Sequence, residues 1–222
     1  MKKTFCLAAA LVTLALPALA AMYTFDYASG FANGGVIPDG NPSGWSDTRA
    51  VSIPQTGITD VNVRLTLSGG YNGDLYGYLV FNGGFAVLLN RVGTGSGSEP
   101  QFSYGFSTAG LNNVRLDDSA SPNIHTVANP AANGTYASDG GTLASFNGLD
   151  PNGSWTLFFA DLSAGDQTTL TSWSLEITAV PEPVPAALGL FGGLLALGGL
   201  VRTLQTRRAL TKAALGDLET TI

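Results

Sequence analysis

The chain has 222 residues, a formal net charge of −6 and one cysteine. Its acidic residues gather in one stretch, since residues 21–179 hold 11 Asp and 2 Glu against 4 Arg and no Lys. An acidic surface without lysine excludes nucleic acid and anionic lipid as expected partners, because both require positive charge. The same charge is compatible with a bound calcium ion, or with solubility alone.

The first twenty residues predict an export signal. Two lysines precede an apolar run of signal-peptide length, and Ala18 and Ala20 occupy the small-residue positions of an A-x-A cleavage site. We expect residues 1–20 to be removed by cleavage after Ala20. Cys6 lies in this segment, so the mature chain is expected to have no thiol, no disulfide and no cysteine-based zinc site.

Residues 21–179 predict a single all-β domain, long enough for a core that needs no disulfide. Its clearest strand, residues 61–67, alternates apolar and polar residues with a period of two. Short Asn- and Gly-containing turns separate it from further strand-like runs, and longer loops rich in Gly, Ser, Asn and Asp fill residues 93–152. We expect a two-sheet sandwich or jelly roll. The expected strands are Val61–Leu67, Leu75–Phe81, Phe85–Leu89, Trp155–Asp161 and Ser172–Thr178.

The sequence shows no set of residues that is typical of a catalytic site. The single histidine, His125, lies in a loop-like segment, and no glycine-flanked serine sits at a strand-to-helix elbow. We therefore interpret the domain as a non-catalytic binding or structural module.

Loops rich in Asp, Asn and Gly indicate calcium, which takes oxygen ligands from carboxylates, carbonyls and water. Turn chemistry alone also explains each carboxylate, because Asp bonds its own backbone in turns. Since no lysine is available to neutralise the charge, we keep calcium as a possible cofactor with a stabilising role. The candidate ligands are Asp117 and Asp118 first, then Asp74 and Asp150.

Residues 180–208 contain a second apolar segment. Residues 184–201 carry no charge and would form a helix of about 27 Å, at the lower limit for crossing a bilayer. Arginines follow directly, which by the positive-inside rule makes residues 209–222 a cytoplasmic tail and places the acidic domain outside. We expect a precursor that spans the membrane once.

The apolar run is preceded by Pro181, Glu182 and Pro183 and followed by the basic pair Arg207 and Arg208. On these residues the segment resembles the PEP-CTERM sorting signal of Gram-negative bacteria. The resemblance implies that an exosortase, a membrane protease-transpeptidase, is a partner and processes the chain at the inner membrane. The mature form would then reside at the cell surface or outside the cell.

Six blocks follow one another within residues 37–178, and the last is the most specific. They are residues 37–52, 58–80, 87–93, 114–120, 134–136 and 143–177. On these blocks the domain resembles the P domain, or Homo B domain, of proprotein convertases and bacterial subtilases. The resemblance implies a jelly roll of the galactose-binding type that in proteases supports a catalytic domain, and we expect no catalytic domain beside it here.

Two functions stay open at this point. The first is a non-catalytic surface or matrix protein that contacts polysaccharide or other envelope components and is linked to exopolysaccharide or biofilm. The second is a hydrolase, or a module that assists the folding or regulation of a separate subtilisin-like protease. A fold alone does not choose between them.

The sorting segment leads to a prediction about processing. We expect mass spectrometry of the mature protein to find no peptide beyond about residue 184, because the exosortase would act near Pro181–Pro183. Recovery of the intact tail, residues 209–222, on released protein would contradict this and make the segment a permanent anchor.

Overall fold

The computed structural model describes residues 19–93, residues 110–181 except Ala128 and Gly141, and residues 192–208 except Leu194 and Ala196. The chain divides into two compact units. One unit comprises residues 19–182, and the other comprises residues 1–18 and 183–222. Each unit is described by itself.

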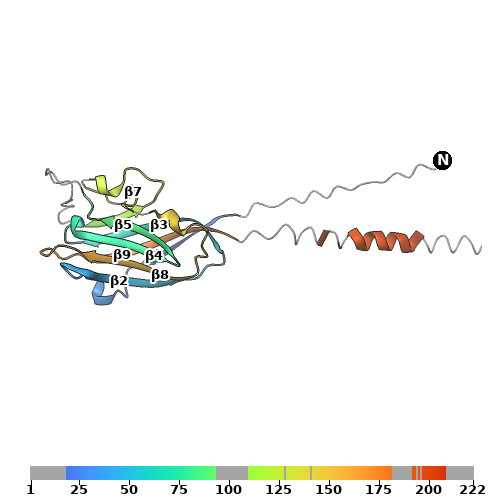
Figure 1. Cartoon of the computed structure of the whole chain (residues 1–222), viewed down its shortest axis with the longest axis horizontal. Coiled ribbons are helices and arrows are strands. Elements are labelled where there is room, and N and C mark those ends of the chain that lie inside the picture. Colours follow the sequence, from blue (N-terminus) through green and yellow to red (C-terminus); the bar gives the residue numbers. More distant parts are fainter. Residues whose placement is uncertain are drawn as a thin grey trace, which may run out of the picture. The chain divides into compact units, whose positions relative to one another are not determined.

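The first unit is all-β and has two sheets, whose strand axes are roughly aligned with one another (Figure 1). All strand pairs are antiparallel except the parallel pair β6–β7. The five-stranded sheet has the order β1 (Ala21–Tyr27), β9 (Thr169–Val180), β3 (Gly57–Ser68), β6 (Leu111–Leu116) and β7 (Thr135–Tyr136). The four-stranded sheet has the order β2 (Asn41–Val51), β8 (Gly153–Asp161), β4 (Leu75–Phe81) and β5 (Gly84–Asn90).

The core lies between the inward faces of the two sheets. Successive side chains of a strand point to opposite faces, so the alternation in β4 and β8 sends every second residue inward. Trp155 of β8 and Trp173 of β9 are 0% and 1% exposed. Trp155 stacks on Phe81 with ring centroids 4.1 Å apart, and Phe146 packs on it at 5.0 Å. The largest side chains of both sheets therefore share one core.

All five predicted strands are confirmed. Leu75–Phe81 has the predicted bounds, and the predicted hairpin is formed by β4 and β5, whose turn begins at Asn82 with a φ of 45°. The run 155–161 lies within β8, 61–67 within β3 and 172–178 within β9. The alternation pattern was sufficient in these segments because one face of each strand is buried.

Two segments with loop-like composition contain regular structure. Residues 41–47 form the start of β2, although their Gly, Ser and Asn content is typical of a loop. The register shifts between Asn41 and Trp45, and Gly44 at φ +64° carries a bulge there. An ideal Cβ on Gly44 would lie 2.4 Å from the Phe158 ring, so a glycine is required. Residues 93–152 also contain regular elements, namely β6, β7 and the short 3₁₀ helices η3 (Ile124–Thr126) and η4 (Leu143–Phe146).

Two further 3₁₀ helices complete the domain, η1 (Ala32–Gly35) and η2 (Asn72–Asp74). In the second unit, the described residues from 192 to 208 are helical, and the Thr203 and Thr206 hydroxyls donate to carbonyls one turn earlier. Within the described part of the chain, no helix is long and apolar enough to cross a membrane. Residues 184–191, Leu194 and Ala196 of the predicted span lie outside that part.

The burial of Trp173 leads to a stability prediction. Its indole N–H donates to the Asp47 carboxylate at 2.8 Å, so truncation removes both a large apolar area and a buried donor. We expect Trp173→Ala to lower the free energy of unfolding by roughly 3–5 kcal/mol in a denaturant titration. Trp173→Phe is the control and should lower the free energy of unfolding by less, because phenylalanine keeps part of the buried aromatic area. An unchanged denaturation midpoint in Trp173→Ala would contradict the packing described here.

Candidate functional site

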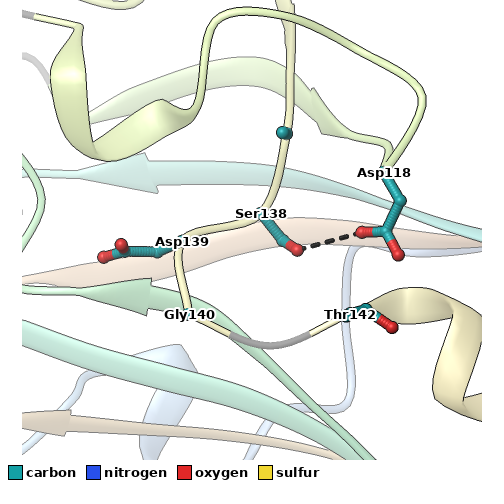
Figure 2. A pocket seen from close by; sticks show the side chains of 6 residues that line it. Asp118, Ser138, Asp139, Gly140 and Thr142 are labelled. Atoms are coloured by element: carbon teal, nitrogen blue, oxygen red, sulfur yellow. Dashed lines mark hydrogen bonds between the residues drawn. The ribbon is translucent and has the colours of Figure 1, made fainter.

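A pocket of about 330 Å³ lies beside strand β7. Its walls come from the loop after β6, the loop after β7 and Thr142, the residue that precedes η4. Figure 2 shows the Ser138 hydroxyl directed at Asp118, while the Asp139 carboxylate points to the other side. The lining residues are Asp118, Ala137, Ser138, Asp139, Gly140 and Thr142.

Hydrogen bonds fix the pocket walls. Asp118 accepts the Ser138 hydroxyl at 3.1 Å and the Ala144 amide at 2.9 Å, which joins the loop after β6 to η4. Asn123 donates to the Ser138 carbonyl at 2.6 Å. The carboxylate of Asp118 is nevertheless exposed, so it keeps acceptor capacity toward the pocket.

The histidine of the sequence lies at the rim of this region. His125 Nδ1 is 3.0 Å from the Asp139 carboxylate, which also accepts the Asn90 amide at 2.7 Å. Ser138 is adjacent in sequence, but its hydroxyl donates to Asp118, and no hydrogen bond joins it to His125 among the described residues. The described side chains around His125 therefore do not form the hydrogen-bonded serine–histidine–aspartate arrangement that nucleophilic catalysis requires.

Asp117 belongs to an ion network on the outward face of the five-stranded sheet. Glu176 is 6% exposed. Its carboxylate accepts hydrogen bonds from Nε of Arg64 and from Nε of Arg115, the latter at 2.7 Å. Arg115 also contacts the Asp117 carboxylate, and Ser119 donates to Asp117 through its amide at 2.8 Å and its hydroxyl at 2.6 Å.

The network lowers the pKa of both acids. Burial raises the pKa of Glu176, but the bonds from Arg115 and Arg64 outweigh it and hold that pKa below its usual value. Burial likewise raises the pKa of Asp117, and the Ser119 and Arg115 contacts reverse the shift. Both carboxylates therefore already have internal cationic or donor partners.

The four predicted calcium ligands do not come together. Among the described residues, no three His, Asp or Glu side chains form a group that could hold a metal. Asp150 is exposed and accepts the Asn152 amide at 3.0 Å, which is ordinary turn chemistry. Asp74 has a different setting, because it lies next to a carboxylate that was not singled out from the sequence.

That carboxylate is Asp161, at the end of β8. It is fully buried, and its Oδ1 accepts the Ser163 amide at 3.2 Å. Burial raises the pKa of Asp161 to about 6, and the charges of Asp74 and Asp39 add to this shift, whereas the backbone amides of Ser163 and Gly40 oppose it. Burial is also the main cause of a raised pKa at Asp74. An inward-facing Asp at the end of an alternating strand was the sequence signal that could have identified this site.

The outward face of the four-stranded sheet carries a row of aromatic rings. Tyr78 stacks on Phe158 with centroids 4.6 Å apart and planes 17° apart, and lies 5.1 Å from Phe85. Tyr76 meets Tyr78 edge to face at 6.0 Å. Phe85 is 45% exposed. We call Tyr76, Tyr78, Phe85 and Phe158 the aromatic row. The alternation within β4 and β8 could have placed three of these rings on one face.

The processing residues fall at the margins of the described chain. Ala20 and Pro181 are exposed, as a protease substrate requires, while Ala18, Glu182 and Pro183 lie outside the described residues. Arg207 and Arg208 lie in the C-terminal helix and are exposed.

No family model matches the chain, and no curated protein matches it. Two similar solved structures are a serine protease of Aeromonas sobria and the complex of that protease with its chaperone ORF2. Each is 19% identical with a TM-score of 0.49, over 74% and 73% of this chain. The chain spans only 28% and 27% of those proteins' own lengths.

The Glu176 network leads to a prediction with a defined pH dependence. Glu176→Gln removes the charge that Arg64 and Arg115 share, and should lower the free energy of unfolding by about 1–3 kcal/mol at pH 7. Because the pKa of Glu176 is lowered on folding, its contribution is present above about pH 5 and is lost as the pH falls through the folded-state pKa. The difference between variant and wild type should therefore shrink toward about pH 3.

Asp26→Asn is the matched control, since Asp26 is exposed on the same sheet and bonds only Ser174 among the described residues. Urea titrations at both pH values are the measurement. A Glu176→Gln deficit that is equal at both pH values would show that the ion network does not depend on the carboxylate charge.

Proposed function

We propose that this chain is an exported, non-catalytic module of the cell envelope that binds neutral polysaccharide through the aromatic row. The observation that carries the proposal is the placement of these rings on the outward face of a sheet whose inward face is core. Exposed apolar patches with polar edges mark interaction sites. A sugar ring presents an apolar C–H face and a rim of hydroxyls, so it matches aromatic rings bordered by hydroxyl groups.

The border of the aromatic row supplies such hydroxyls. Thr48 and Thr156 lie opposite each other on β2 and β8, with their hydroxyl oxygens 2.9 Å apart. The hydroxyls of Tyr76 and Tyr78 make no hydrogen bond to a described residue, and both side chains are half-buried. The face thus combines apolar contact with several groups that can donate to or accept from a sugar.

Charge restricts the kind of polysaccharide. Each of the four arginines of residues 21–179 is hydrogen bonded within the domain: Arg49 to Asp47, Arg64 and Arg115 to Glu176, and Arg91 to the Gly73 carbonyl. The domain also has no lysine and a formal excess of negative charge. A neutral polymer is therefore favoured over an anionic one.

The wider biological setting of the proposal comes from the sequence. We infer that the domain is a stand-alone relative of the P domain with a jelly-roll, galactose-binding-like architecture, and that residues 180–208 are a PEP-CTERM signal with a membrane-spanning helix, processed by an exosortase. Export through the inner membrane and a role in exopolysaccharide or biofilm follow from that signal. The buried β-sandwich core and the exposed Ala20 and Pro181 are compatible with this proposal.

The second candidate is a module that assists a separate subtilisin-like protease. It follows from the same P-domain resemblance, and it is the candidate that the names of the two similar solved structures fit. Their TM-scores are too low to support it by themselves. Protein binding and glycan binding by the same chain can be measured separately, which distinguishes the two candidates.

Retardation in gels containing neutral polysaccharides tests the first candidate. We expect Phe85→Ala and Tyr78→Ala to weaken binding by tenfold or more, because each removes a ring of the aromatic row. Met22→Ala is the matched control, since Met22 is a large apolar residue 67% exposed on the other sheet. Equal retardation of wild type and both ring variants would contradict the proposed surface, and binding to a subtilisin-like protease without any glycan binding would favour the second candidate.

A further inference from the structure

Two side-chain oxygens near one end of the sandwich are buried and have no hydrogen-bond partner among the described residues. They are Asp161 Oδ2 and Asn72 Oδ1, each on a residue with 0% exposure. The other atoms of both groups are engaged, since Asp161 Oδ1 accepts the Ser163 amide and Asn72 Nδ2 donates to the Gly110 carbonyl at 3.2 Å. Buried polar atoms are almost always paired, so two such acceptors require an explanation.

The chain brings further oxygen-bearing groups to the same place. Asp161 is opposite Leu75 of β4 on one side and opposite Asn41 of β2 on the other. The Leu162 amide donates to the Asp74 carbonyl at 2.8 Å, which joins the end of β8 to η2. The Gly165 amide donates to both carboxylate oxygens of Asp39 at 3.1 Å. The segments 39–41, 72–74 and 161–165 therefore meet around Asp161.

A third buried side-chain oxygen belongs to Thr168, which follows the 161–165 segment in the chain. Thr168 Oγ1 is buried without a partner among the described residues, and an ideal Cβ on Gly70 would be 1.9 Å from it. Gly70 has a φ of +61° and would also place a Cβ 3.1 Å from the Asp166 carbonyl. A glycine is thus needed for the 70–74 segment to approach the 166–168 segment this closely.

The local charge is strongly negative. The carboxylates of Asp39 and Asp74 both raise the pKa of the buried Asp161, after burial itself. Arg91 lies nearby, with Nε 3.1 Å from the Gly73 carbonyl and Nη2 3.4 Å from the Ser163 hydroxyl, and it lowers the pKa of Asp74. One guanidinium does not balance three carboxylates, so a second positive charge would stabilise the folded state.

We propose that this end of the sandwich binds a calcium ion, with Asp161, Asp74 and Asn72 as its side-chain ligands. Calcium accepts about six to eight oxygen ligands and readily combines carboxylates with amide and backbone carbonyl oxygens. This mixture suits a site in which no three acidic or histidine side chains form a metal-binding group among the described residues. Magnesium fits less well, because it requires near-octahedral geometry and keeps several of its waters. The site shares only Asp74 with the ligands expected from the sequence.

Thermal unfolding of the full-length protein tests the proposal. The protein is first treated with chelator, dialysed, and then heated with and without excess calcium. Ligand that binds only the folded state raises stability by mass action, so a hundredfold excess over Kd should raise Tm by about 5–10 °C. Magnesium at the same concentration is the control for general charge screening. No calcium shift, or an equal shift with magnesium, would overturn the proposal and leave a buried water as the partner of Asp161.

Variants locate the ion. Asp161→Asn should abolish the calcium shift and raise Tm in chelator, because it removes the buried charge. Asp74→Asn should weaken calcium binding at least tenfold by calorimetric titration and is informative even if Asp161→Asn fails to fold. Asp150→Asn is the matched control at the opposite end of β8 and should respond to calcium like the wild type. A full calcium response in both Asp161→Asn and Asp74→Asn would overturn the site.

Discussion

A buried hydrogen bond between Trp173 and Asp47 ties the two sheets of the domain together. The indole belongs to β9 of the five-stranded sheet and the carboxylate to β2 of the four-stranded sheet. Asp47 also accepts Nε of Arg49 at 2.7 Å, and the Arg49 guanidinium lies 4.9 Å from the centre of the Tyr27 ring. Apolar packing tolerates sliding of one sheet over the other, whereas a directional bond inside the core fixes their relative position. The positions of the outward-facing groups on the two sheets relative to one another therefore depend on this bond.

The outward faces of the two sheets differ in how far their side chains already bind one another. On the five-stranded sheet, Glu176 and Asp117 are held by Arg64 and Arg115, so these two carboxylates have cationic partners within the chain. On the four-stranded sheet, the rings of the aromatic row contact one another, and Phe85 is 45% exposed. A face whose groups already bind each other has little to gain from a partner, while the aromatic face gains by covering its apolar area.

The sequence predicted the fold where one principle dominated. In β3, β4 and β8 the period-2 pattern was sufficient, because each strand has one buried face and one outward face. It failed for β2, where Gly44 and Ser43 resemble a loop although a bulge keeps the strand in the sheet. The positive φ of Gly44 and the close approach of the Phe158 ring and the Phe159 carbonyl explain why a glycine occurs there, and these contacts are not visible in the chain order.

The candidate site could be predicted from the sequence only in part, for a similar reason. Asp117 and Asp118 were conspicuous as a pair, yet Arg115 and Ser138 bind them. Asp161 was hidden at the end of an apolar strand, and its importance depends on Asp39 and Asp74, which are about 90–120 residues away in the chain and adjacent only after folding. Composition can show that unpaired carboxylates exist, but the fold decides which of them share a space.

The position of β9 determines how the domain would carry mechanical load. The chain leaves the domain after Val180 at the end of β9, which is hydrogen bonded to β1 on one side and to β3 on the other. A pull applied beyond Val180 would act along this strand and load both ladders in parallel, so many hydrogen bonds would have to break together. A strand at the sheet edge would resist through one ladder only. The polypeptide connection is thus made at a mechanically resistant part of the sandwich.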